Sequence, residues 1–177
     1  MVKHLWSALS LICVATLMAE AAINDKWHNL GDFGTIFVEE EQKYNWFEAW
    51  EECAMRNMTL IDIDTAEKNT IVDKVLRNPF EKCPNLWLGG NDLGLEGKFV
   101  WSSTGKRFEF SNWSKGQPDN YKSNEHCVHY YTITDFEWND APCTSKMGFI
   151  CEENRFLREA RRDLQIKKNF IDQLFAL

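Results

Sequence analysis

Oxygen-bearing side chains gather in two short stretches of the C-terminal half of the chain. They are Gln117, Asp119, Glu125, Asn139 and Asp140, and three of the five are carboxylates. Calcium is a hard cation that takes about six to eight oxygen ligands from carboxylates, amides, carbonyls and water. The set therefore predicts a calcium site with one or two positions left for water or for the hydroxyls of a ligand.

A softer metal fits these stretches poorly. Zinc prefers thiolate and imidazole ligands in closely spaced pairs. His126 and His129 do not have a two-histidine zinc spacing with a third ligand, and the nearby cysteines are expected to form disulfides. Ca²⁺ is therefore the metal that the sequence predicts.

The elements that must position these residues follow an α+β order. Apolar spacing and Asn45 as N-cap predict a helix to about Asn57, and Asp64 or Thr65 begins a second helix that Asn78-Pro79 stops. Strands are expected at 33–38, 60–63, 86–91, 99–101, 127–131 and 148–151. Helices come early and strands late, which favours α+β over repeated βαβ units. Residues 102–126 form a long polar loop, and loops of that length are usually functional.

The apolar faces of the two helices are read from their spacing. In the first, Trp46, Ala49, Trp50 and Cys53 are expected to face the core. In the second, Ile71 and Val75 are expected there, joined by Val72 or Leu76.

The first residues have the pattern of a secretory leader. An apolar run at 5–17 precedes Ala19-Glu20-Ala21, which predicts a signal peptide over residues 1–21. A membrane anchor is the alternative, but the run is short for a bilayer span, and no later segment is apolar enough. We therefore expect a secreted, extracellular protein without a transmembrane segment. The net charge of −7 argues against nucleic acid as a partner.

In a secreted protein the cysteines can form disulfides and the glycan acceptor motifs can be used. Five cysteines follow the leader, so one is left over after pairing in an oxidising compartment. The motifs at Asn57 and Asn112 are candidate N-glycosylation sites.

The C-terminal residues 153–177 predict a basic amphipathic helix. Leu157, Leu164 and Ile171 lie seven residues apart, and six basic residues accompany three acids after residue 154. Without these residues the remaining chain has a net charge of −10. Three interpretations stay open: a tail that packs on its own domain or is partly disordered, a helix for self-association or a partner helix, and a membrane-surface helix. Lys167 at a core heptad position weakens the coiled-coil interpretation.

Several motifs in this order resemble the C-type lectin family. They are Gln117-Pro118-Asp119, Glu125 two residues before Cys127, Trp138-Asn139-Asp140, two closing cysteines and the tetrapeptide Trp87-Leu88-Gly89-Gly90. The likeness covers about residues 27–152 and is greatest to secreted insect lectins of the galactose type. It implies a C-type lectin-like fold over residues 22–152, with two helices flanking two small antiparallel sheets and a long calcium-binding loop. It also implies a cis Pro118 and the disulfides Cys53–Cys151 and Cys127–Cys143.

The resemblance further implies a sugar site. In this family two neighbouring sugar hydroxyls reach the ion and also hydrogen-bond its ligands. Gln117 and Asn139 would donate, and Asp119 and Glu125 would accept. The order Gln-Pro-Asp goes with galactose-type glycans. Tyr121 stands where an aromatic side chain can stack on the sugar, but the glycine-rich insert of strict galactose binders is absent, so mannose-type glycans stay possible.

A second, auxiliary calcium site is found in many relatives. Asp92 and Glu96 match two of its acids, whereas Asn120 and His126 stand where acids are expected. The resemblance therefore implies a weak or empty auxiliary site.

Cys83 is the cysteine that the implied pairs leave over, either as a free thiol or as an interchain disulfide. It and the C-terminal helix are two routes to a homo- or hetero-oligomer, which a weak single-sugar site would need for useful binding. A protein-binding module of the same fold is the alternative function. An enzyme is not expected, because the chain lacks a phosphate loop, a nucleophile elbow and an HExxH helix, and its clustered carboxylates match ion ligands.

Overall fold

A computed structural model gives the structure of the chain and describes residues 26–77 and 84–175. The expected signal peptide at 1–21 and Cys83 lie outside the described residues. The helices are α2 (Trp46–Met55), α3 (Ala66–Arg77) and α4 (Arg155–Phe175), with 3-10 turns η1 (Gly31–Phe33) and η2 (Tyr121–Ser123). The strands are β1 (Trp27–Asn29), β2 (Thr35–Tyr44), β3 (Met58–Leu60), β4 (Leu86–Asn91), β5 (Val100–Trp101), β6 (Cys127–Tyr130), β7 (Trp138–Ala141) and β8 (Met147–Glu153).

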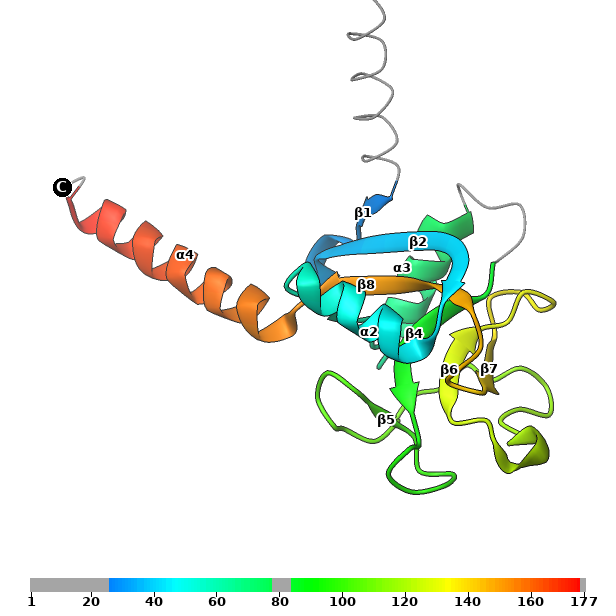
Figure 1. Cartoon of the computed structure of the whole chain (residues 1–177). Helices are drawn as coiled ribbons and strands as arrows, with labels where there is room; N and C mark the ends of the chain where they lie inside the picture. The colour runs from blue at the N-terminus through cyan, green and yellow to red at the C-terminus, as the bar shows by residue number, and fades with distance from the viewer. Residues whose placement is uncertain (1–25, 78–83, 176–177) are drawn as a thin grey trace, which may run out of the picture.

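A mixed eight-stranded sheet runs through the domain (Figure 1). Its strands follow the order β1-β2-β8-β4-β6-β7, with β3 paired to β8 and β5 paired to β4. β4 and β8 pair in parallel, whereas β2 and β8, and β6 and β7, are antiparallel. The parallel pairing of β4 with β8 joins the two small antiparallel sheets that were expected into one continuous mixed sheet. The fold class is α+β.

The starts of both core helices follow from their capping residues. The Asn45 side chain accepts from Glu48 N at 2.9 Å, and Glu48 Oε2 accepts from Asn45 N at 2.7 Å. This capping box satisfies two backbone donors at the first turn of α2. At α3, Thr65 Oγ1 accepts from Lys68 N at 3.1 Å, so Thr65 is the capping side chain.

Alternating side chains build a core on each face of the sheet. Ile36, Leu88 and Ile150 belong to one buried cluster, together with Val72 and Leu76 of α3. Residues one position away on the same strands (Phe37, Trp87 and Phe149) belong to the other, beside α2 and the disulfides. This period of two is the geometry of a strand that is buried on both faces.

Several details differ from the sequence prediction. The strand expected at 60–63 is β3, which ends at Leu60, and residues 61–63 are not in a strand. Trp50 is 47% exposed, so α2 buries only three of the four expected side chains, Trp46, Ala49 and Cys53. In α3, Val72 and Leu76 are fully buried, while Ile71 and Val75 pack at the edge of the core. The strands β1 and β7 were also not predicted, because both are short and β7 contains the polar residues of the Trp138-Asn139-Asp140 motif.

Two disulfides cross-link the domain. They join Cys53 of α2 to Cys151 of β8, and Cys127 of β6 to Cys143. These are the pairs that the family resemblance implies. The second disulfide lies at the end of the β6–β7 hairpin, next to the candidate calcium ligands.

A buried charged cluster lies between β3, α3 and β8. Lys68 Nζ and Glu152 Oε2 form a buried ion pair at 2.5 Å. Asp62 N donates to Glu152 Oε1 at 2.7 Å, and the Asp62 carboxylate accepts from the Ser103 hydroxyl. Burial, and then the nearby Glu152 carboxylate, raise the pKa of Asp62 to about 7.

Replacing Asp62 by asparagine is expected to stabilise the fold at pH 8 by about 2–4 kcal/mol. The pKa of Asp62 is raised in the folded state above its ordinary value of 3.8, so the cost of ionising it is absent below pH 4 and complete above pH 7. The amide removes this cost and leaves the Lys68–Glu152 pair electrically balanced. Denaturant unfolding at pH 4 and pH 8 measures the effect, with the exposed neighbour Asp64→Asn as control. An equal gain at both pH values would contradict it.

Candidate functional site

The long loop that carries part of the site is anchored on β7. Ser114 N donates to Trp138 O at 2.9 Å, and Trp138 N donates to Asn112 O at 2.8 Å. The Trp113 ring meets the buried Trp138 ring edge-on, with centroids 5.9 Å apart. Because Asn139 and Asp140 follow Trp138 on β7, this aromatic contact brings the two polar stretches of the sequence side by side.

The carboxylate of Asp140 holds the tip of the loop. It accepts from Asp119 N at 3.2 Å and from Asn120 N at 2.9 Å. The preceding Gln117–Pro118 peptide bond is cis, as the family resemblance implies. These contacts orient the backbone of Asp119 and place its side chain beside β7.

Three carboxylates converge at this point. Asp119, Glu125 and Asp140 each offer one oxygen, and these oxygens lie within 4.8 Å of one another. Asp140 is 1% exposed, Glu125 is half-buried and Asp119 is exposed, so the group opens to solvent on one side. A cluster of this shape can bind a cation and still admit a ligand.

The electrostatics of the cluster favour a counterion. Burial raises the pKa of Glu125, and the Asp140 and Asp119 carboxylates add to the rise. Burial also raises the pKa of Asp140, against the two backbone N–H groups that donate to it. In both residues the negative form is disfavoured, so a proton or a divalent cation relieves the repulsion, and the two compete with each other.

Two amide oxygens of the predicted ligand set test whether a cation fits. Gln117 Oε1 and Asn139 Oδ1 are buried and have no hydrogen-bond partner among the described residues. A buried carbonyl oxygen without a partner costs free energy, and a metal ion would satisfy it. Gln117, Asp119, Glu125, Asn139 and Asp140 therefore fit a Ca²⁺ ion by their chemistry.

His129 lies behind Asn139. Asn139 Nδ2 is 3.5 Å from His129 Nε2, and the two residues pair across β6 and β7. Burial lowers the pKa of His129 to about 4, so the imidazole is neutral near pH 7. A neutral ring adds no positive charge beside a cation site.

Asn120 has a supporting role that the sequence analysis did not predict. It was considered for the auxiliary site, but its Oδ1 accepts from Glu125 N at 3.0 Å and its own N–H donates to Asp140. It adopts the left-handed conformation with φ 43°, which asparagine tolerates better than most residues. In the sequence, the only indication of this turn was an asparagine between Asp119 and Tyr121.

Tyr121 lies at the rim of the cluster. Its N–H donates to Glu125 Oε2 at 3.2 Å, and the side chain is 61% exposed. Lys122 Nζ lies 5.1 Å from the centroid of its ring. The ring is therefore accessible at the edge of the carboxylate group, which is the place where a stacking residue is expected.

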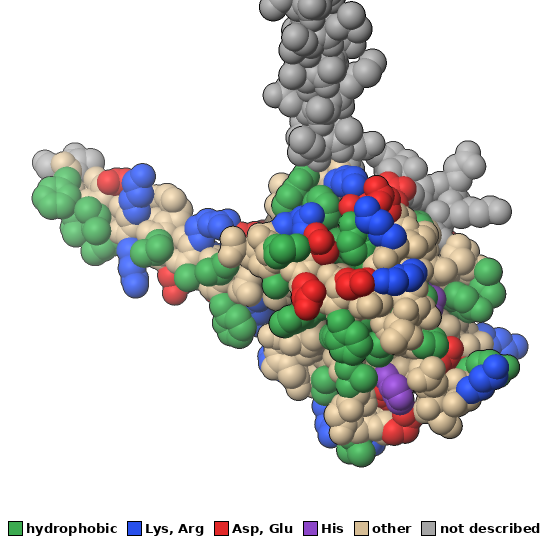
Figure 2. Space-filling model, viewed as in Figure 1, with side chains coloured by type: hydrophobic (Ala, Val, Ile, Leu, Met, Phe, Trp, Pro, Cys, Tyr) green, Lys and Arg blue, Asp and Glu red, His purple; other side chains and the backbone are tan. Residues whose placement is uncertain are grey.

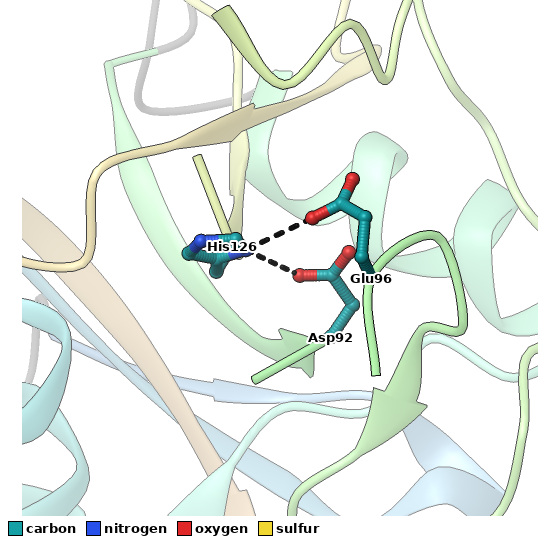
Figure 3. Close-up of side chains that lie close together, drawn as sticks. All are labelled: Asp92, Glu96 and His126. Carbon is teal, nitrogen blue, oxygen red and sulfur yellow. Dashed lines mark hydrogen bonds and ion pairs between the residues drawn. The ribbon is translucent and has the colours of Figure 1, made fainter. Parts of the chain in front are cut away.

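The residues considered for an auxiliary calcium site form a separate cluster, shown in Figure 3. His126 Nδ1 lies 3.0 Å from Asp92 Oδ1 and 3.4 Å from Glu96 Oε2. The side chains point toward one another, with the imidazole facing both carboxylates (Figure 3). Asp92 also accepts from Gly97 N at 2.7 Å. At the auxiliary position, the imidazole of His126 therefore pairs with the carboxylates of Asp92 and Glu96. Asn120 instead belongs to the cluster that contains Glu125 and Asp140.

The two glycan acceptor motifs differ in accessibility. Asn57 is exposed at the end of α2, in a left-handed conformation with φ 55°. Asn112 is half-buried, and its Nδ2, the atom to which a glycan would be attached, donates to Phe136 O at 3.0 Å. Of the two, Asn57 is the better placed acceptor.

Comparison with known proteins assigns the family. The Lectin C-type domain family matches residues 42–153, more than half of the chain. The chain belongs to the C-type lectin family. Among similar proteins are lectin subunit alpha of Sarcophaga peregrina, 46% identical over 125 residues, and salivary C-type lectin 1 of Aedes albopictus, 38% identical over 115 residues. The first match covers 67% of this chain but 44% of the relative's length, and the second covers 61% and 75%.

Solved structures agree with this assignment. The carbohydrate-recognition domain of the mouse scavenger receptor C-type lectin has a TM-score of 0.62 and 26% identity, covering 73% of this chain and 95% of that domain. C-type lectin domains generally bind carbohydrate and calcium and are generally not enzymes, which supports a carbohydrate-binding role for this C-type lectin. In the described part of the chain, no helix has the length and apolarity needed to cross a membrane.

Proposed function

We propose that this C-type lectin binds galactose-type glycans through a calcium ion held by Gln117, Asp119, Glu125, Asn139 and Asp140. The observation that supports the proposal most directly is the meeting of three carboxylates within 4.8 Å. Two buried amide oxygens of the predicted ligand set, which have no hydrogen-bond partner among the described residues, add to it. A site of this composition suits Ca²⁺, and its solvent-facing side leaves access for a sugar.

Each side chain has a distinct task toward the sugar. A bound calcium would supply positive charge that draws two neighbouring hydroxyl oxygens. The amide nitrogens of Gln117 and Asn139 donate to those oxygens, and the carboxylates of Asp119 and Glu125 accept from the hydroxyl protons. Tyr121 packs against the apolar face of the ring. The arrangement of amides and acids favours the hydroxyl geometry of galactose, with mannose-type glycans bound more weakly.

Retention on immobilised galactose tests the proposal. Because one pair of hydroxyls is a small contact, single-site affinity is expected near about 1 mM. The protein should bind the column with calcium present and elute with free galactose or with a chelator. Calcium binding in calorimetry without retention on galactose or mannose would overturn the glycan proposal and favour a protein-binding module of the same fold.

Exchanging the acid and the amide of the loop is expected to invert sugar preference. In the double variant Gln117→Glu with Asp119→Asn, the donor and acceptor sites trade places while the total charge stays the same. We expect at least about a tenfold change in the galactose-to-mannose ratio, equal to about 1.4 kcal/mol. Competition by free monosaccharides on a mixed glycan surface measures it, with the exposed loop residue Lys115→Ala as control. An unchanged ratio in a calcium-loaded variant would contradict the assigned roles.

We also propose that residues 1–21 are a cleaved leader, that residues 22–152 are the recognition domain and that the protein is secreted. The two disulfides support this, since such bonds persist in oxidising compartments. Cys83 and the C-terminal helix are the proposed routes to oligomers.

A further inference from the structure

Helix α4 leaves the domain with an apolar surface that the domain does not cover. Eight of its large apolar side chains are between 50% and 87% exposed. Figure 2 shows hydrophobic side chains at the surface along this helix, and Figure 1 shows the helix projecting away from the sheet. Amphipathic helices in proteins gain most of their stability by packing the apolar face.

The contacts of α4 with its own domain are confined to its first two turns. Arg158 donates to Phe33 O, and Arg161 pairs with Glu153. Every described residue of α4 after Arg158 is exposed. The domain therefore fixes the start and the direction of the helix and leaves its apolar face free.

The free face has the heptad spacing of a coiled coil. Leu157, Leu164 and Ile171 occupy the a positions of three heptads. Ala160, Lys167 and Leu174 occupy the d positions. The anchoring residues Arg158 and Arg161 then fall on b and e, so the domain holds one flank of the helix while the d and g side is open.

We propose that α4 pairs with α4 of a second copy of this chain in a parallel coiled coil. The charges beside the seam favour this partner and this direction. Asp163 is at g and Lys168 is at e of the next heptad, so in a parallel pair each Asp163 faces the partner's Lys168. An antiparallel pair would instead bring e against e, where both Arg161 and Lys168 are basic.

Lys167 at the d position is compatible with this arrangement. It follows Asp163 by four residues on the same helix, a spacing at which an acid and a base attract. A polar residue at one core position lowers stability, but it also selects the register and the oligomer state. In the in-register pair the two Lys167 side chains meet at the same level of the seam, so their repulsion lowers the stability of the pair, and Asp163 of each helix offsets part of this cost.

A parallel pair has a consequence for binding. The β6–β7 hairpin and η2 lie on the side of the domain away from α4 (Figure 1). Two copies joined by their helices would present both candidate sites away from the stem, and linked weak sites bind a multivalent surface far more tightly than one site does. The pairing itself does not depend on sugar binding.

Sedimentation of the full chain without sugar tests the pairing, in a Cys83→Ser background that excludes an interchain disulfide through that residue. We expect a dimer at micromolar protein. Asp163→Lys or Lys168→Asp alone should weaken the dimer about tenfold, because two attractive pairs become repulsive. The double variant should restore it, and the outward-facing Arg162→Glu should have no effect.

Cysteine cross-linking tests the direction. Under mild oxidation Ala160→Cys should form a covalent dimer, because position 160 faces its own copy in a parallel pair, and the outward Gln165→Cys should not. A monomer up to millimolar protein, failure of the double charge variant to restore the dimer, or no cross-link through Ala160→Cys would overturn the proposal. So would a monomer whose α4 binds vesicles containing phosphatidylserine, which would assign the helix to a membrane surface.

Discussion

Replacing Asp140 by asparagine is expected to lower calcium affinity about 100-fold or more and to abolish retention on galactose. Asp140 has two functions that the amide cannot both fulfil. Its charge contributes to the carboxylate group with Asp119 and Glu125, and its two oxygens accept from Asp119 N and Asn120 N. The amide removes the charge and places an NH₂ group against a backbone donor, so the loop loses its support.

Calorimetric titration with calcium measures the first effect, and column retention measures the second. Glu109→Gln is the control, because it likewise replaces an acid by its amide and removes one negative charge, but at an exposed position of the long loop outside the carboxylate cluster. It should leave both readouts unchanged. If Asp140→Asn folds normally and keeps calcium affinity within a factor of about three, the ion is bound elsewhere and the assigned ligand set is wrong.

Removal of the Cys53–Cys151 disulfide is expected to cause the largest loss of stability. The bond joins residues 98 positions apart, and closing a loop of that length lowers the entropy of the unfolded chain. The chain-entropy model gives about 4–5 kcal/mol for this loop. Both cysteines are also fully buried between α2 and β8, so Cys53→Ala with Cys151→Ala loses packing as well.

The Cys127–Cys143 bond is the internal comparison. It spans 16 positions, so its removal is expected to cost about 3 kcal/mol in the same model. Because it joins β6 to the chain just after Asp140, its loss should also weaken calcium binding. Denaturant unfolding at fixed calcium concentration measures both double variants. A larger loss of stability from the shorter loop would show that packing and strain outweigh chain entropy here.

Much of the fold was predictable because its signals are local. The capping residues Asn45 and Glu48 lie three apart in the sequence and form the expected helix start. The positions of most strands follow from β-branched and aromatic residues between turns. The family motifs implied the site residues and the cis Pro118, since a pattern of several spaced motifs is far more specific than any single one.

Other features depended on which side of an element faced the core. The period of a helix defines an apolar face, but the exact centre of that face depends on the neighbours. Trp50 was expected inside and is 47% exposed, whereas Val72 and Leu76 are fully buried. The side chains of Trp46, Ala49 and Cys53 already occupy the face that α2 turns toward the sheet.

The sequence by itself determined the family, the α+β order of the elements and the supply of oxygen ligands for a cation. Only the tertiary structure decided which polar groups are buried together. Asn120 supports Asp140, and Asp62 meets Glu152, because segments separated in the chain are packed side by side. The pKa of a carboxyl group and the partners of an amide depend on such neighbours, and local spacing does not encode them.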